Sequence, residues 1–273
     1  MMNLNVNEYA MQVAAIMNGT YREVEKANGV ICHGVMLDMG NMSPVVYVDR
    51  FFAEGLTPDE AAERIREDIV DAPKIENPME IITDYEQAGK MLRARLYNKA
   101  TKAEVYRSAA EYGFEDLIII PYIDLGNGAA AKVTKSLLDH WGQDADTVIS
   151  LAIENARDYT ITPLAQVLAE LMGGMPFLAG EDDVPLYVLT NENKTCGAIG
   201  VIAAKAELEE RFPNGYVVLP SSIHEVLILP KEQLTQEMEA LSEMIVEINQ
   251  TQVAPEEVLG NHPYEFDGIA IAA

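Results

Sequence analysis

Cysteine and histidine, the residues that bind transition metals most often, are scarce in this chain and widely scattered. The 273 residues include two cysteines, Cys32 and Cys196, and neither belongs to a CxxC pair. The four histidines, which show no HxH or HxxxH spacing, are His33, His140, His224 and His262. Structural zinc sites need several such ligands at short spacings. The sequence therefore predicts no metal site, no disulfide framework and two reduced thiols.

Long hydrophobic runs are also absent. The longest, such as residues 117–121, fall far short of the roughly 20 residues that a membrane helix needs. The N-terminus lacks the basic start and apolar core of a signal peptide. Neither a P-loop nor a G-x-G-x-x-G motif occurs, so no nucleotide cofactor is expected. We therefore expect a soluble, cytoplasmic protein without a cofactor.

Basic residues are few. The chain has 19 Lys+Arg against 44 Asp+Glu, which gives a formal net charge of −25. Such a surface repels nucleic-acid phosphates and anionic membranes, so neither is expected as a partner. A basic protein is the partner that this charge would attract. The apolar content of 49% is that of an ordinary globular protein, and a chain of this length can bury a full core.

The first 75 residues favour a β-meander followed by a helix. Asn28-Gly29 is a strong hairpin signal between two strand-like runs. Thr57-Pro58-Asp59-Glu60 combines a capping box with proline at the first helical position. Two prolines mark residues 71–78 as a connector. We therefore expect an N-terminal unit over 1–75 and a main α+β domain over 76–273, with one continuous domain as the alternative.

The main part of the chain mixes helix and hairpin signals. Asp84 begins a predicted helix whose apolar face includes Leu92 and Leu96, and a second helix is predicted over about 100–112. Residues 117–123 predict a buried strand that turns into a hairpin. A long helix is predicted to begin at Pro230. The fold class expected is α+β, with antiparallel or mixed β-sheets built from hairpins and covered by amphipathic helices.

The segment around residues 216–230 contains the strongest candidates for chemistry. Ser222, His224 and Glu225 interrupt two apolar strand-like runs, the second over 223–229. Because successive strand residues face opposite sides, at least one polar group is expected to point into covered space. Such a group must find partners. The alternatives are a structural hydrogen-bonding node, a hydrolase-type site at these three residues, and a Cys196 nucleophile paired with His224.

Cationic residues gather in only one stretch of the chain, and its members are Lys90, Arg93, Arg95, Lys99, Lys102 and Arg107. In so acidic a protein, these side chains are expected to neutralise neighbouring carboxylates. The alternative is a docking site for an anionic ligand, with Arg93, Arg95, Lys99, Lys102 and Arg107 as the binding residues.

Several segments carry a resemblance to a known family. They are Asn28-Gly29-Val30 with Pro44-Val45-Val46-Tyr47, the run YVLTN from Tyr187, PSSIHEV from Pro220, and VAPEEVL from Val253. In these the chain resembles the domain-of-unknown-function family 5688, uncharacterised bacterial proteins of gut anaerobes. The likeness is most specific from Tyr187 onward. It implies a cytoplasmic bacterial protein and brings no activity, cofactor or functional residue.

Three functions stay open at this point. The acidic surface and the lack of a reaction motif favour a soluble, non-enzymatic interaction or regulatory protein. The first alternative is a hydrolase-type enzyme with its site near Ser222, His224 and Glu225. The second is a small-molecule or anion sensor that uses the cationic stretch.

Overall fold

Three antiparallel sheets and their covering helices make up the protein. The structure is a computed structural model that describes residues 4–40, 43–71, 77–126, 128–173 and 186–268. Every strand pairing within these ranges is antiparallel, which confirms the α+β expectation. None of the helices in the described residues combines the length and the apolar character needed to cross a membrane.

The N-terminal unit is a three-stranded sheet in the order β1-β2-β3 with three helices. Its elements are α1 (Val6–Ile16), β1 (Thr20–Glu25), β2 (Ile31–Met36), β3 (Val45–Tyr47), α2 (Asp49–Ala53) and α3 (Pro58–Asp71). Asn28 takes the left-handed conformation at the tip of the β1–β2 hairpin, with φ of 57°. The hairpin prediction is therefore confirmed.

A separate hydrophobic cluster holds this unit together. Tyr9, Val13, Phe51 and Ile65 are its large buried members, contributed by α1, α2 and α3. The capping box predicted for α3 is also present: the Thr57 backbone N–H donates to the Glu60 carboxylate at 2.7 Å, and the Glu60 N–H donates to Thr57 Oγ1 at 3.3 Å. The predicted connector over 71–78 lies largely outside the described residues, and the domain boundary there stays a prediction.

The second sheet runs β4-β6-β5, with β7 paired to β6. Its strands are β4 (Leu92–Asn98), β5 (Arg107–Ser108), β6 (Leu117–Gly126) and β7 (Ala129–Lys132). Its helices are α4 (Pro78–Thr83), α5 (Tyr85–Met91), α6 (Lys135–Trp141) and α7 (Ala145–Glu154). The buried strand predicted over 117–123 is confirmed as part of β6.

Two helix predictions in this region are wrong. The helix that Asp84 caps ends at Met91, and the chain continues as β4. Residues 100–112 contain β5 and a short 3-10 turn instead of a helix. Leu92 and Leu96 fit a helical spacing of four, but with Ala94 they also fit the period of two of a strand. Pairing with β6 along the whole length of β4 decides between the two.

The third sheet has the order β12-β10-β11-β9-β8. Its strands are β8 (Tyr159–Pro163), β9 (Tyr187–Asn191), β10 (Gly215–Leu219), β11 (Val226–Pro230) and β12 (Tyr264–Asp267). Its helices are α8 (Leu164–Leu171), α9 (Gly200–Ala203), α10 (Lys205–Arg211) and α11 (Met238–Gln252). The long helix begins at Met238 rather than at Pro230, because Pro230 still belongs to β11 and is followed by a 3-10 turn.

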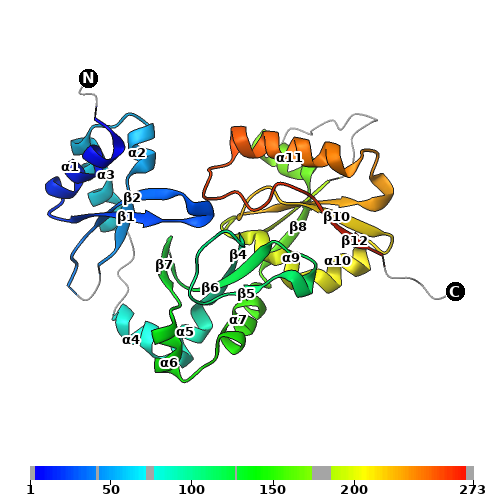
Figure 1. Cartoon of the computed structure of the whole chain (residues 1–273), viewed down its shortest axis with the longest axis horizontal. Helices are drawn as coiled ribbons and strands as arrows, with labels where there is room; N and C mark the ends of the chain where they lie inside the picture. Colours follow the sequence, from blue (N-terminus) through cyan, green and yellow to red (C-terminus); the bar gives the residue numbers. More distant parts are fainter. Residues whose placement is uncertain (1–3, 41–42, 72–76, 127, 174–185, 269–273) are drawn as a thin grey trace.

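The tip of the β1–β2 hairpin connects the N-terminal unit to the rest of the chain (Figure 1). Asn28 Nδ2 donates to the carbonyl oxygens of Pro255 at 2.9 Å and Val258 at 2.8 Å. The Asn28 backbone N–H donates to Thr101 Oγ1 at 3.4 Å. The hairpin tip therefore touches both the segment after β4 and the segment after α11.

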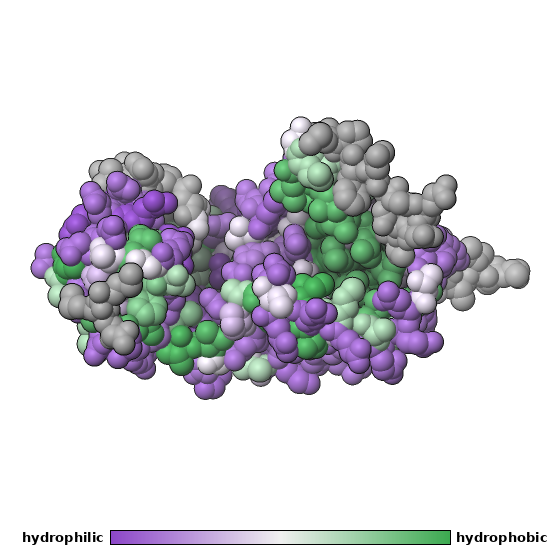
Figure 2. Space-filling model, turned by 90° about the horizontal axis from the view of Figure 1, so that it is seen from above, coloured by the Kyte–Doolittle hydropathy of each residue, from purple (hydrophilic) through white to green (hydrophobic). Residues whose placement is uncertain are grey.

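Hydrophilic residues cover most of the face seen in Figure 2, as the net charge of −25 leads one to expect. One broad hydrophobic area lies on the part of the molecule that holds the third sheet. Large apolar side chains exposed on α11 are Met244 and Ile248.

The β4–β6 pairing makes a prediction about stability. Ile119 on β6 is fully buried, so Ile119→Ala should lower the free energy of unfolding by about 2–5 kcal/mol. Ile31→Ala, at an exposed strand position, should change it by less than about 1 kcal/mol. Urea unfolding of both variants measures the difference, and equal effects would contradict this core assignment.

Candidate functional site

Ser222, His224 and Glu225 lie on the connection between β10 and β11, not on a strand. β11 begins at Val226, so the predicted strand over 223–229 is wrong for residues 223–225, and the prediction of alternating faces does not apply there. The register of β11 against β10 and β9 accounts for this, because the pairings of β11 with both neighbours start at or after Val226.

The His224 ring connects two other segments of the chain. Its Nδ1 accepts a hydrogen bond from the Cys196 backbone N–H at 3.1 Å. Its Nε2 lies 3.2 Å from Glu257 Oε1. Because Nδ1 accepts, the ring carries a proton on Nε2, the nitrogen that lies within ion-pair distance of the carboxylate. His224 thus joins the loop after β9 to the segment after α11.

Backbone hydrogen bonds around His224 complete this node. Thr190 Oγ1 donates to the His224 carbonyl at 2.9 Å, and the His224 N–H donates to Ser222 Oγ at 3.0 Å. The Ser222 N–H donates to the Glu225 carbonyl at 3.1 Å. A serine nucleophile needs its hydroxyl to donate to a ring nitrogen of its base. Here Ser222 Oγ accepts a backbone N–H, and both ring nitrogens of His224 face other groups.

Cys196 lies against this node and takes the left-handed backbone conformation, which is rare for residues other than glycine. Its φ is 55°, and its side chain is buried. Burial raises the pKa of the Cys196 thiol, while the nearby charge of Arg95 acts in the opposite direction. Cys32, the other cysteine, is also a free, buried thiol whose pKa is raised by burial. The fold does bring Cys196 and His224 together, but through the Cys196 backbone.

The cationic stretch is dispersed by the fold. Three of its six members contact acidic side chains: Lys90 lies 3.8 Å from Glu86, Lys102 lies 2.8 Å from Glu25, and Arg107 lies 3.1 Å from Asp146. Arg93 donates to the carbonyls of Lys90 and Leu92. Lys99 is exposed. Arg95 differs from all of these.

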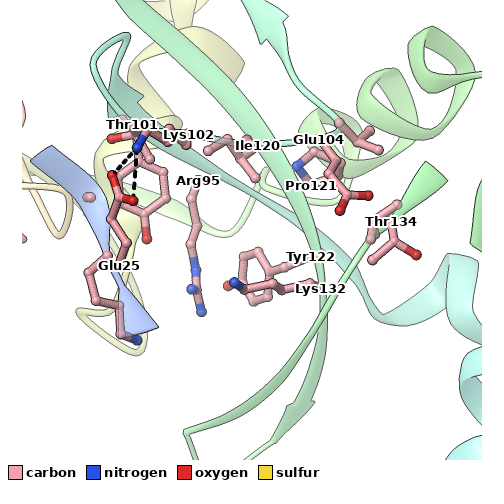
Figure 3. Close-up of a pocket in the computed structure, with 16 residues that line it drawn as sticks. Glu25, Arg95, Thr101, Lys102, Glu104, Ile120, Pro121, Tyr122, Lys132 and Thr134 are labelled. Atoms are coloured by element: carbon pink, nitrogen blue, oxygen red, sulfur yellow. Dashed lines mark hydrogen bonds and ion pairs between the residues drawn. The ribbon is translucent and has the colours of Figure 1, made fainter. Parts of the chain in front are cut away.

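The Arg95 side chain leaves β4 on the face opposite the buried Leu92, Ala94 and Leu96, and enters a cavity of about 440 Å³ (Figure 3). We name this space the Arg95 cavity; it is bounded by β4, β6, the β1–β2 hairpin and residues 101–105. The guanidinium lies over the Tyr122 ring, 3.9 Å from its centroid. Nε is buried without a hydrogen-bond partner among the described residues.

Other polar residues line the Arg95 cavity. The guanidinium lies beside the side chains of Tyr97 and Tyr122 and the Cys196 thiol, and all three groups affect its pKa. Burial lowers the pKa of Arg95 and these neighbours raise it by more, so its pKa is raised and the group stays charged. Lys132 and the Glu25–Lys102 ion pair lie on the wall of the same space (Figure 3).

The sequence alone placed Arg95 and Lys102 in one candidate site but missed Tyr97, Tyr122 and Lys132. The alternation in the run LRARLYN contained a signal for Tyr97, since residues two apart on a strand share a face. Tyr122 and Lys132 had no such signal, because they reach the site through the pairing of β6 with β4 and β7. Within the described ranges, no three His, Cys, Asp or Glu side chains are grouped as a metal site.

These features define an α+β protein with a polar cavity between its N-terminal hairpin and its second sheet. Residues 3–268 match the model of a family described as "Family of unknown function (DUF5688)". The chain belongs to this family, as the resemblance of its segments indicated. No curated protein and no solved structure matches it.

The His224 node predicts a graded stability effect. His224→Leu should lower the free energy of unfolding by about 1–3 kcal/mol, because the Cys196 N–H loses its acceptor. His224→Asn, which keeps an acceptor oxygen near the Nδ1 position, should lose less. Urea unfolding measures both variants, and equal losses would show that the acceptor is unimportant.

Stability should also fall at alkaline pH. Burial raises the pKa of Tyr97, Tyr122, Tyr216 and Cys196. The unfolded chain releases these protons near ordinary values of about 8.5–10, whereas the folded protein retains them. The stabilisation is therefore complete below that range. It falls as pH rises from the ordinary pKa of each group towards its raised pKa in the folded protein, by about 1.4 kcal/mol per pH unit for each retained proton.

Urea unfolding measured from neutral pH to above the ordinary tyrosine pKa of about 10 tests this expectation. Tyr216→Phe removes one of the raised groups and should flatten the decline. A free energy of unfolding that stays constant through this range would contradict the assigned burial of these side chains.

Proposed function

We propose that this protein is a non-enzymatic regulatory protein that binds a small anionic ligand in the Arg95 cavity. This combines two of the functions drawn from the sequence, the regulatory protein and the anion sensor. It rests on one observation: the charged Arg95 side chain lines a cavity without a carboxylate partner among the described residues.

Burial distinguishes this cation from the others. Lys102 forms its ion pair with Glu25 at an exposed position, whereas the buried Nε of Arg95 has no hydrogen-bond partner among the described residues. A partly buried charge without a counter-ion is unfavourable, because its lost hydration is not replaced. An anionic ligand that enters the cavity would supply the missing hydrogen-bond acceptors.

The cavity also suits such a ligand in size and chemistry. Its volume of about 440 Å³ lies within the range of small-molecule sites. A guanidinium pairs with planar carboxylates or with phosphates through two parallel hydrogen bonds. The Tyr122 ring orients this group from one side, and Lys132 is a further cation on the wall.

The net negative charge of the chain supports a basic protein as the partner that recognises the ligand-bound state. Two free, buried thiols support a location in the reducing cytoplasm.

A thermal-shift screen tests the ligand proposal. The probes are inorganic phosphate, a set of mono- and dicarboxylates, and nucleoside monophosphates. At about a hundred times its dissociation constant, a bound anion adds roughly 2.7 kcal/mol to stability. Arg95→Met should remove this stabilisation, and Arg95→Lys should retain only part of it, because the planar fork is lost.

Arg64→Met is the matched control, since Arg64 is an exposed arginine on α3 away from the cavity. It should respond to the anions as the wild type does. If no anion stabilises the wild type, or if Arg95→Met responds like Arg64→Met, the proposal is wrong.

A further inference from the structure

A second concave surface also includes a residue of the hairpin tip and differs in chemistry from the Arg95 cavity. It is a groove of about 530 Å³. Five of the residues that line it carry side-chain amides: Asn28, Asn98, Asn249, Gln250 and Asn261. The others are aliphatic residues of α11 and of the segment after it, together with Gly260. We name this surface the amide groove.

Among the described residues, those that line the amide groove are neither charged nor aromatic. Charged residues make up 23% of the chain, and the net charge is −25. The amide groove differs in this respect from the Arg95 cavity, which Glu25 and Glu104 help to line. It would receive an uncharged polar ligand without the repulsion that the acidic surface would exert on an anion.

Two of the amides hold the walls of the groove in place. Asn28 Nδ2 donates to the carbonyls of Pro255 and Val258. Asn249 is buried at 7% exposure, and its Nδ2 donates to the Gly260 carbonyl at 2.8 Å and to Asn261 Oδ1 at 3.0 Å. These bonds fix the positions of the segment after α11, which carries Asn261.

The remaining amide atoms offer both donors and acceptors. Asn98 Oδ1 accepts the Ala100 N–H and Asn261 Oδ1 accepts from Asn249, so each keeps its Nδ2 for another partner. Across the described part of the chain, neither Gln250 nor Asn28 Oδ1 is engaged in a side-chain hydrogen bond. The groove thus presents donors from Asn98, Asn261 and Gln250 and acceptors from Gln250 and Asn28.

We propose that the amide groove binds an extended, uncharged peptide segment of a partner protein. A side-chain amide has the same donor and acceptor pair as a peptide group and can match both at once. The aliphatic residues between the amides offer contacts for small apolar side chains. A neutral sugar is less well matched, because the described lining residues include no aromatic ring for its apolar face to pack against. This site is separate from the Arg95 cavity.

Side-chain amide signals in a ¹⁵N–¹H spectrum of the full chain test the proposal. The probe is the blocked, uncharged peptide acetyl-Ala-Val-Ala-Val-amide. The side-chain NH₂ signals of Asn98, Gln250 and Asn261, assigned from single variants, should shift saturably with added peptide. Gln250→Glu places a charge in the groove and should weaken binding by about tenfold or more.

Gln252→Glu is the matched control, because Gln252 is exposed on the same helix and does not line the groove. It should bind the peptide as the wild type does. Absence of a saturable shift, or equal weakening by both variants, would overturn the proposal. Shifts produced by glucose or N-acetylglucosamine but not by the peptide would also overturn it and would assign the groove to a neutral sugar.

Discussion

The pairing of β4 with β6 determines which side chains form the core and which face the Arg95 cavity. Along β4, Leu92, Ala94 and Leu96 are buried in the main hydrophobic cluster. Arg95 and Tyr97 alternate with them and therefore face the other side. The same pairing brings Tyr122 under the guanidinium. A single sheet register thus produces both the stability of the second sheet and the candidate binding site.

Two further contacts hold other segments around this sheet. The His224 ring joins the Cys196 backbone to Glu257. His224 therefore fixes the loop after β9, which contains Cys196. The tip of the β1–β2 hairpin contributes to both concave surfaces. Lys26 and Ala27 line the Arg95 cavity, and Asn28, the next residue, lines the amide groove. An occupant of either surface therefore contacts the same hairpin.

Local signals in the sequence predicted the local structure well. The Asn28-Gly29 hairpin and the Thr57 capping box need only neighbouring residues, and both are present. β4 was predicted as a helix because its leucines fit both periods, and only pairing with a distant strand resolves the ambiguity. The Arg95 cavity likewise depends on contacts between segments distant in the sequence. In the sequence, Arg95 cannot be distinguished from the five other cations of its stretch. The tertiary structure pairs three of these with carboxylates and places Arg95 in a cavity.

The Nε–H signal of Arg95 in a ¹⁵N–¹H spectrum reports most directly on the central claim that this side chain is an anion-binding group. The buried Nε has no partner among the described residues, and Arg95→Lys identifies its signal. We predict a saturable shift of this signal as an anion is added, with no change in the Arg64 signal. A signal that no carboxylate or phosphate moves, or that moves only in parallel with that of Arg64, would contradict the account.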